Sequence, residues 1–175
     1  MSTLPILIDC DGVLADFTGG CLELARRKAN ILDKTEADIT RWDTSGCLGW
    51  TGLNTAVDVA IRYSEFCYRL AEYDGALAWF RDVELEFGSD RVFVCTSPWN
   101  AEWAGQRAAW LEKRGVPLAR QIQCAAKHLI PGYLIDDRPG VSSTRASGQT
   151  FTLARPWNAD DPNVYLVEES VVAKQ

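Results

Sequence analysis

ILIDCDGVLADF, residues Ile6 to Phe17, decides the fold because it places two carboxylates directly after an apolar run. The run from Leu4 to Ile8 is almost continuously apolar, which is typical of a parallel strand covered on both faces. Asp9 and Asp11 follow where that strand ends. From Asp16 to Ala29 apolar residues recur at helical spacing, and basic residues close the run. The stretch therefore predicts a buried strand, an acidic loop and a helix.

The same order of strand, polar loop and helix returns further along the chain. Further strands are predicted over Arg91 to Cys95, Arg120 to Ala125, Tyr133 to Asp136 and Gln149 to Leu153, and further helices over Ala76 to Phe87 and Ala101 to Arg114. Alternating strands and helices imply right-handed crossovers and a parallel sheet. The fold class is therefore α/β, with a doubly wound parallel sheet of about five strands.

Residues 30–73 interrupt this alternation with polar residues, glycines and two tryptophans, followed by a helical pattern from Ala56 to Tyr73. We expect a small, mainly helical insertion after the first strand and helix. Residues 1–29 and 74–175 then form one core domain, and residues 30–73 form the insertion.

Composition excludes several classes of function. The 175 residues are 47% hydrophobic, enough for one full core plus a modest insertion. A net charge of −6 without a basic block argues against a nucleic acid polymer as partner. The sequence has no apolar segment of about 18 residues, so we expect no membrane partner and a cytoplasmic location. The six cysteines include no CxxC pair, which favours reduced thiols over zinc or disulfides.

With a single histidine, His128, the chemistry must use carboxylates, lysine and hydroxyls. In open α/β sheets ligands bind beyond the carboxyl ends of the strands. The polar residues at these predicted ends are Asp9, Asp11, Thr96, Ser97, Lys127, Asp136 and Asp137. Four carboxylates in one crevice would repel one another strongly. A hard divalent cation such as Mg²⁺ would resolve this repulsion, because it prefers oxygen ligands.

The segments DCDGV, VCTS, Lys127 and LIDDRP resemble, in this order, the four motifs of the haloacid dehalogenase-like phosphohydrolases. DGVLADF, CTSP and LIDDRP further resemble the 5'(3')-deoxyribonucleotidases of that superfamily. YDGALAWF resembles their Pro-Gly-Ala-Leu turn, with Asp74 in place of the proline. The resemblance implies a Rossmann-like core, residues 30–73 as a helical cap, and an Mg²⁺-dependent phosphomonoesterase of the 5'-nucleotidase type. Its substrate would be a nucleoside monophosphate, and a homodimer is left open.

The resemblance also implies roles for the acidic residues. Asp9 would be the nucleophile that forms an aspartyl-phosphate, and Asp11 the general acid and base. Mg²⁺ would bind Asp9, the backbone carbonyl of Asp11 and a carboxylate of the last motif. Asp137 is the better direct ligand there, and Asp136 the indirect one.

Phosphate oxygens would be held by Thr96, Ser97 and Lys127. Phe17 corresponds to a position that packs on the nucleotide base. Further stacking candidates in the insertion are Trp42, Trp50, Phe66 and Tyr68.

Simpler interpretations exist for several of these residues. Thr96 and Ser97 would cap the following helix, and Lys127 taken alone is typical of a surface lysine. The helical spacing of Trp99, Trp103 and Trp110 favours packing over ligand contact.

Other functions also fit parts of the pattern. A phosphatase of the same superfamily acting on another small phosphate ester is the main alternative. A phosphoacceptor receiver domain uses the same residue types, but its acceptor aspartate follows the third strand, whereas DxD here follows the first. A catalytically silent binding protein would have no chemical reason to keep both Asp9 and Asp11. Base and sugar preference, and acceptance of 3'-phosphates, stay open.

Overall fold

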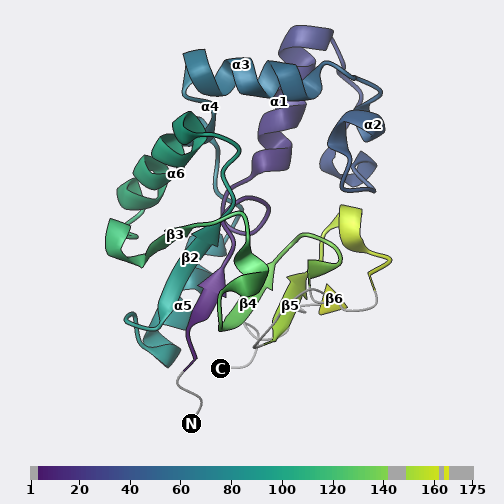
Figure 1. Ribbon diagram of the computed structural model, residues 1–175. Helices are drawn as coiled ribbons and strands as arrows, with labels where there is room; N and C mark the ends of the chain where they lie inside the picture. Colours follow the sequence, from purple (N-terminus) through teal and green to yellow (C-terminus); the bar gives the residue numbers. More distant parts are fainter. Residues whose placement is uncertain (1–3, 142–148, 162–163, 166–175) are drawn as a thin grey trace.

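The computed structural model describes residues 4–141, 149–161 and 164–165, and these contain a six-stranded sheet in which every pairing is parallel. Its order is β3-β2-β1-β4-β5-β6 (Figure 1). The strands are β1 (Ile6–Ile8), β2 (Val92–Thr96), β3 (Gln121–Gln123), β4 (Tyr133–Asp136), β5 (Thr150–Leu153) and β6 (Val164–Tyr165). The predicted α/β class is confirmed, and β6 is added to the five expected strands.

Strand β1 lies in the interior of the sheet. Ile8 pairs with Val94 of β2 on one side and with Ile135 of β4 on the other. Leu7 and Ile8 have no exposed surface, as the continuous apolar run predicts for a strand covered on both faces. The two acidic motifs therefore end on neighbouring strands.

Helices α5 (Ala76–Phe87) and α6 (Ala101–Lys113) lie beside the sheet, whereas α1 (Phe17–Ala29) packs against elements of residues 30–73. Helix α1 begins where predicted, because the side chain of Asp16 accepts a hydrogen bond from Gly19 N at 2.7 Å. Asn100 caps α6 by accepting from Trp103 N at 2.8 Å. The expectation that Thr96 and Ser97 cap this helix is wrong, since the chain does not enter the helix until Ala101.

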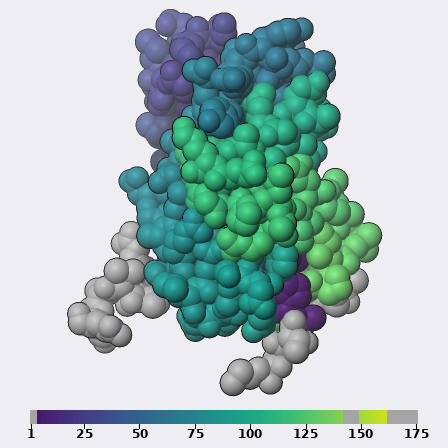
Figure 2. Space-filling model, turned by 90° about the vertical axis from the view of Figure 1, so that its left-hand side faces the viewer, coloured from purple at the N-terminus to yellow at the C-terminus, as the bar shows by residue number. Residues whose placement is uncertain are grey.

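Residues 30–73 contain η1 (Glu36–Asp38), α2 (Thr44–Leu48), α3 (Leu53–Ser64) and α4 (Phe66–Arg69). In Figure 1, α1, α2 and α3 lie together above the sheet. Figure 2 shows this from the side, with the purple-to-blue segments above the teal and green ones. The mainly helical content matches the expected insertion, whereas the division into two domains stays a prediction, and parts of the core range lie outside the described residues.

Short 3-10 turns, η2 (Leu118–Arg120), η3 (Lys127–Leu129) and η5 (Pro156–Asn158), complete the described elements. All six cysteines are free, and Cys10 and Cys95 are fully buried, as expected for reduced thiols. Within the described part of the chain, no helix has the length and apolar character needed to span a bilayer.

Candidate active site

The loop after β1 is tightly folded around Cys10. Its carbonyl oxygen accepts hydrogen bonds from the backbone N–H groups of Leu14 and Ala15, both at 2.8 Å. Gly12 has a φ of +81°, and a Cβ built there would lie 2.0 Å from Oδ2 of Asp137. Only glycine fits this position without displacing Asp137. The loop therefore brings the first acidic motif into close contact with the last.

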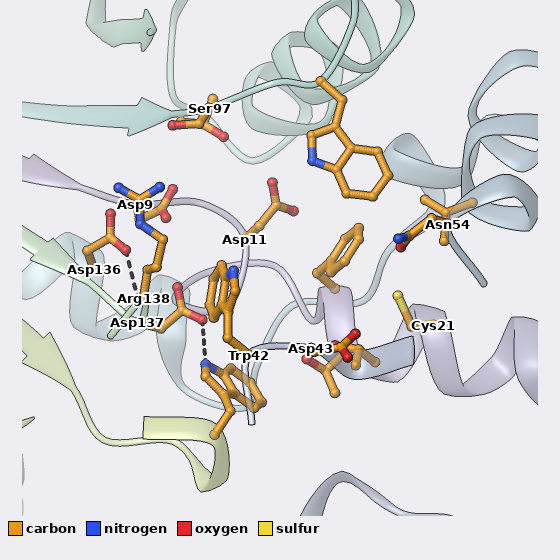
Figure 3. A pocket seen from close by; sticks show the side chains of 18 of the residues that line it. Asp9, Asp11, Cys21, Trp42, Asp43, Asn54, Ser97, Asp136, Asp137 and Arg138 are labelled. Carbon is orange, nitrogen blue, oxygen red and sulfur yellow. Dashed lines mark hydrogen bonds between the residues drawn. The ribbon is translucent and has the colours of Figure 1, made fainter. Parts of the chain in front are cut away.

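A cavity of about 440 Å³ opens beyond the carboxyl ends of β1, β2 and β4. Asp9, Asp136 and Asp137 gather at one end of it, and Asn54 lies toward the other (Figure 3). Asp11 lies between these two ends. The lining of the cavity also includes the remaining predicted site residues, namely Phe17, Thr96, Ser97 and Lys127. The structure brings these residues to one cavity, as the strand-end rule predicts for all of them except Phe17, while their roles stay predictions.

Lys127 is buried among the carboxylates, with 3% of its surface exposed, so it is not the surface lysine that its local sequence suggests. Its Nζ lies 2.6 Å from Oδ2 of Asp9 and 3.0 Å from Oδ2 of Asp136. These two carboxylates raise the pKa of Lys127 in spite of its burial, which acts in the opposite direction. The lysine therefore remains a cation and links the ends of β1 and β4.

One ammonium group does not neutralise three buried carboxylates. Burial raises the pKa of Asp9 to about 7, although Lys127 opposes the shift. Burial, followed by the charges of Asp9 and Asp136, raises the pKa of Asp137 well above its usual range. Carboxylate oxygens of all three aspartates lie within 4.8 Å of one another. This arrangement is compatible with a divalent cation, which would stabilise the ionised forms.

The hydrogen bonds of Asp136 and Asp137 differ in a way that bears on this cation. Asp136 uses both oxygens, one toward Lys127 and the other accepting from Arg138 N at 2.9 Å. In Asp137, Oδ2 accepts from Trp157 Nε1, but Oδ1 is buried without a hydrogen-bond partner among the described residues. Asp137 therefore has the free buried oxygen that a cation requires.

Asp11 is paired with a different buried cation, Arg107, and not with Lys127. Arg107, on α6, donates from Nη2 to Oδ1 of Asp11. Burial raises the pKa of Asp11, and the positive charges of Arg107 and then Lys127 oppose the shift. Arg107 was not identified from the sequence, because one arginine within a mixed polar and apolar helix has no distinguishing local signal.

The two hydroxyls at the end of β2 differ in what they contact. Thr96 is 1% exposed, and its Oγ1 has no hydrogen-bond partner within the described ranges. Ser97 donates from Oγ to the carbonyl oxygen of Cys124 at 3.1 Å. The Thr96 hydroxyl is therefore free to bind an oxygen of a ligand that enters the cavity.

Aromatic side chains cover one wall of the cavity. The ring of Phe17 stacks on Trp103, with centroids 5.3 Å apart and planes inclined by 18°, and Trp99 meets Trp103 edge-on at 4.5 Å. The packing interpretation is confirmed for Trp103 and Trp110, which are buried in the core, although Trp103 also lines the cavity. Trp99 is 54% exposed and lines the cavity, so packing does not account for it.

Of the four stacking candidates in the insertion, only Trp42 lines the cavity. Phe66 is buried and packs edge-on against Phe17, with centroids 5.8 Å apart. The Nζ atom of Lys113 lies over the ring of Tyr68, 5.4 Å from its centre. Trp50 and Tyr68 are partly buried against the core. These three therefore serve packing rather than lining.

A search against protein-family models finds no match. The chain is 31% identical over 148 residues to the mitochondrial 5'(3')-deoxyribonucleotidase of Mus musculus, a match that covers 79% of this chain and 66% of that relative. It therefore spans about two thirds of the length of that relative. Among solved structures, a hydrolase from Streptococcus pneumoniae TIGR4 superposes with a TM-score of 0.49 at 15% identity, over 88% of this chain and 95% of the other.

Proposed function

The chain belongs to the 5'(3')-deoxyribonucleotidase family, and we propose that it is an Mg²⁺-dependent phosphomonoesterase that removes phosphate from nucleoside monophosphates. One observation carries this proposal. Three buried carboxylates, the buried Lys127 and the unpartnered hydroxyl of Thr96 converge at one end of a cavity whose wall is aromatic. This end suits a phosphate with a cation, and the wall suits a flat ring.

In the first step an oxygen of Asp9 attacks phosphorus, and the bond from phosphorus to the ester oxygen breaks. The ester oxygen keeps that electron pair and takes a proton from Asp11, which leaves the nucleoside as an alcohol. The buried position of Asp11 raises its pKa and so favours the protonated form that this step needs.

In the second step Asp11 takes a proton from a water molecule as the water oxygen bonds to phosphorus. The bond between phosphorus and Asp9 then breaks, its electron pair returns to the carboxylate, and inorganic phosphate leaves. Lys127 and Thr96 hold phosphate oxygens through both steps by charge and by hydrogen bond. Asp11 thus donates and later accepts one proton.

Asp9, Asp137 through its free Oδ1, and the backbone carbonyl of Asp11 would hold Mg²⁺, with Asp136 acting through its bonds to Lys127 and Arg138. When bound, the ion neutralises negative charge on the phosphate and the carboxylates. The chemistry of the donors supports this, because all of them are oxygens and hard cations prefer oxygen.

The nucleotide base would lie against Phe17, Trp99 and Trp103, with residues 30–73 acting as a cap that excludes water. The test is phosphate release from all ribo- and deoxyribonucleoside monophosphates and from a set of sugar phosphates, with and without Mg²⁺. Preference for a nucleotide supports the proposal. Turnover of sugar phosphates without any nucleotide preference would favour the alternative, a phosphatase for another small ester. A cytoplasmic location stays a prediction.

A further inference from the structure

Arg107 is a fully buried cation whose position the proposed reaction does not explain. Its side chain has no exposed surface, and it donates from Nη1 to the carbonyl oxygen of Cys67 at 3.3 Å and from Nη2 to Asp11. A guanidinium group does not lose its proton in a protein, so burying it requires compensating partners. Asp11 is the carboxylate that supplies this compensation in the described part of the chain.

The position of Arg107 is fixed independently of Asp11. On the same helix, Gln106 accepts from Cys67 N at 3.0 Å and donates to the carbonyl oxygen of Ile61, while Trp110 donates from Nε1 to the carbonyl oxygen of Leu70 at 2.8 Å. These bonds join α6 to the backbone on both sides of α4. The guanidinium group also lies 5.4 Å from the centre of the Trp110 ring. Arg107 is therefore a fixed point against which Asp11 is oriented.

Two buried cations contact three of the four carboxylates. Lys127 contacts Asp9 and Asp136, and Arg107 contacts Asp11. Lys127 is also an electrostatic neighbour of Asp11. Without Arg107, the side chain of Asp11 could rotate toward Lys127, because rotation about its two side-chain bonds decides where its oxygens point.

We propose that Arg107 is a positioning residue for Asp11: it holds Oδ1 and so keeps the other oxygen available to the departing ester oxygen and the attacking water. This inference rests on the proposed function. It predicts that loss of Arg107 impairs the two proton transfers but not the attack by Asp9, because Asp9 is held by Lys127 and by the N–H of Cys10 at 2.6 Å.

The variant Arg107→Met keeps much of the side-chain length and removes the charge and the donors. With a nucleotide, kcat is expected to fall about 10²- to 10⁴-fold, the usual contribution of acid–base catalysis, while KM stays within about threefold because phosphate and base contacts are untouched. With p-nitrophenyl phosphate, whose leaving oxygen needs no proton, a rapid burst of about one nitrophenol per site should precede slow turnover. Arg107→Lys, which keeps the charge, should recover part of kcat.

Gln106→Leu is the matched control, because it removes an adjacent link to the same backbone without touching Asp11. It is expected to lower Tm and to leave kcat and the burst unchanged, because the bonds of Trp110 to Leu70 and of Arg107 to Cys67 still hold Arg107 in place. A double variant of Arg107→Met and Asp11→Asn should be no slower than Asp11→Asn alone, since both changes remove one function.

If the wild-type protein releases phosphate from nucleotides, the proposed function stands, and three results would then overturn the inference about Arg107. These are wild-type kcat in Arg107→Met, equal losses with both substrates and no burst, and additive losses in the double variant. If Arg107→Met does not fold, Arg107→Lys decides in the same way, through its kcat and its burst. Absence of phosphate release by the wild-type protein from every ester would instead refute the proposed function itself.

Discussion

Trp157 donates a hydrogen bond from Nε1 to Oδ2 of Asp137 across 3.1 Å. Asn158, the next residue, donates from Nδ2 to the backbone oxygen of Asp137 at 2.7 Å. The turn after β5 therefore holds the last acidic residue at two points. Because Oδ2 is occupied by the indole, the direction of Oδ1 toward the carboxylate cluster is fixed.

Replacing Trp157 by Phe should weaken cation binding, because the ring remains while the donor that orients Asp137 is lost. A loss of about 10-fold in affinity for Mg²⁺ is expected, at the lower end of the effect of partners that orient metal ligands. Calorimetric titration measures it. Trp110→Phe is the control, since it removes an indole hydrogen bond of similar length to Leu70 and should lower Tm without changing cation affinity. Equal cation affinity in Trp157→Phe and the wild type would refute the orienting role.

Gly12→Ala should destabilise the protein by about 2–4 kcal/mol, because strain at positive φ adds to a collision with Asp137. Gly49→Ala is the matched control: its φ is +64° and nothing lies within 4 Å of an added Cβ. It should cost only about 1 kcal/mol. Urea unfolding compares the two variants. Cation affinity should fall in Gly12→Ala alone, and an equal cost for both variants would contradict the close approach of the loop to Asp137.

Stability should fall as pH rises when no divalent cation is present. Asp9 has a pKa of about 7 in the folded protein against 3.8 as its ordinary value, so the folded state retains a proton that the unfolded chain releases between these values. The free energy of unfolding in EDTA should therefore decrease from about pH 4 to pH 7. Asp9→Asn should remove the part of this slope that Asp9 contributes.

Mg²⁺ should reverse that trend, because it binds the ionised carboxylates and displaces their protons. The gain in Tm on adding Mg²⁺ is expected to be larger at pH 8 than at pH 5. Thermal unfolding at both pH values, with EDTA or Mg²⁺, measures the difference. A gain independent of pH would show that the cation binds elsewhere than at Asp9 and Asp137.

Trp99→Ala should raise KM for nucleotides about 10-fold, the scale of losing one base-stacking partner, with little change in kcat. KM for a phosphate ester without a ring should not change, because the phosphate contacts remain. Tyr63→Ala is the control, an aromatic residue of α3 that is 81% exposed and does not line the cavity. Steady-state kinetics with both substrates distinguishes loss of stacking from general damage.

Local patterns predicted the framework well. Helix α5 and strand β4 have the predicted bounds, because clear turn residues precede each of them. The rule that parallel strands present their carboxyl ends at one edge was sufficient to bring Asp9, Asp136 and Lys127 together. Strand β6 was missed because two residues carry no periodicity.

Long-range packing decided the rest of the site. The burial of Arg107 depends on how α4 rests on α6, which no pattern within the helix contains. Helical spacing correctly placed Trp103 and Trp110 on related faces. It could not show that Trp103 stacks on Phe17 and lines the cavity with it. Trp157 reaches Asp137 from the turn η5, which follows β5 and lies about 20 residues further along the chain than the acidic motif.

The interior place of β1 has a consequence for the order in which the chain acquires activity. Ile8 is made well before its neighbours Val94 and Ile135, so β1 waits for partners on both sides. Turnover then requires β4 to have left the ribosome. Catalysis can for that reason serve as a reporter of completed folding, and truncation before β4 should leave an inactive nascent chain with an exposed apolar strand.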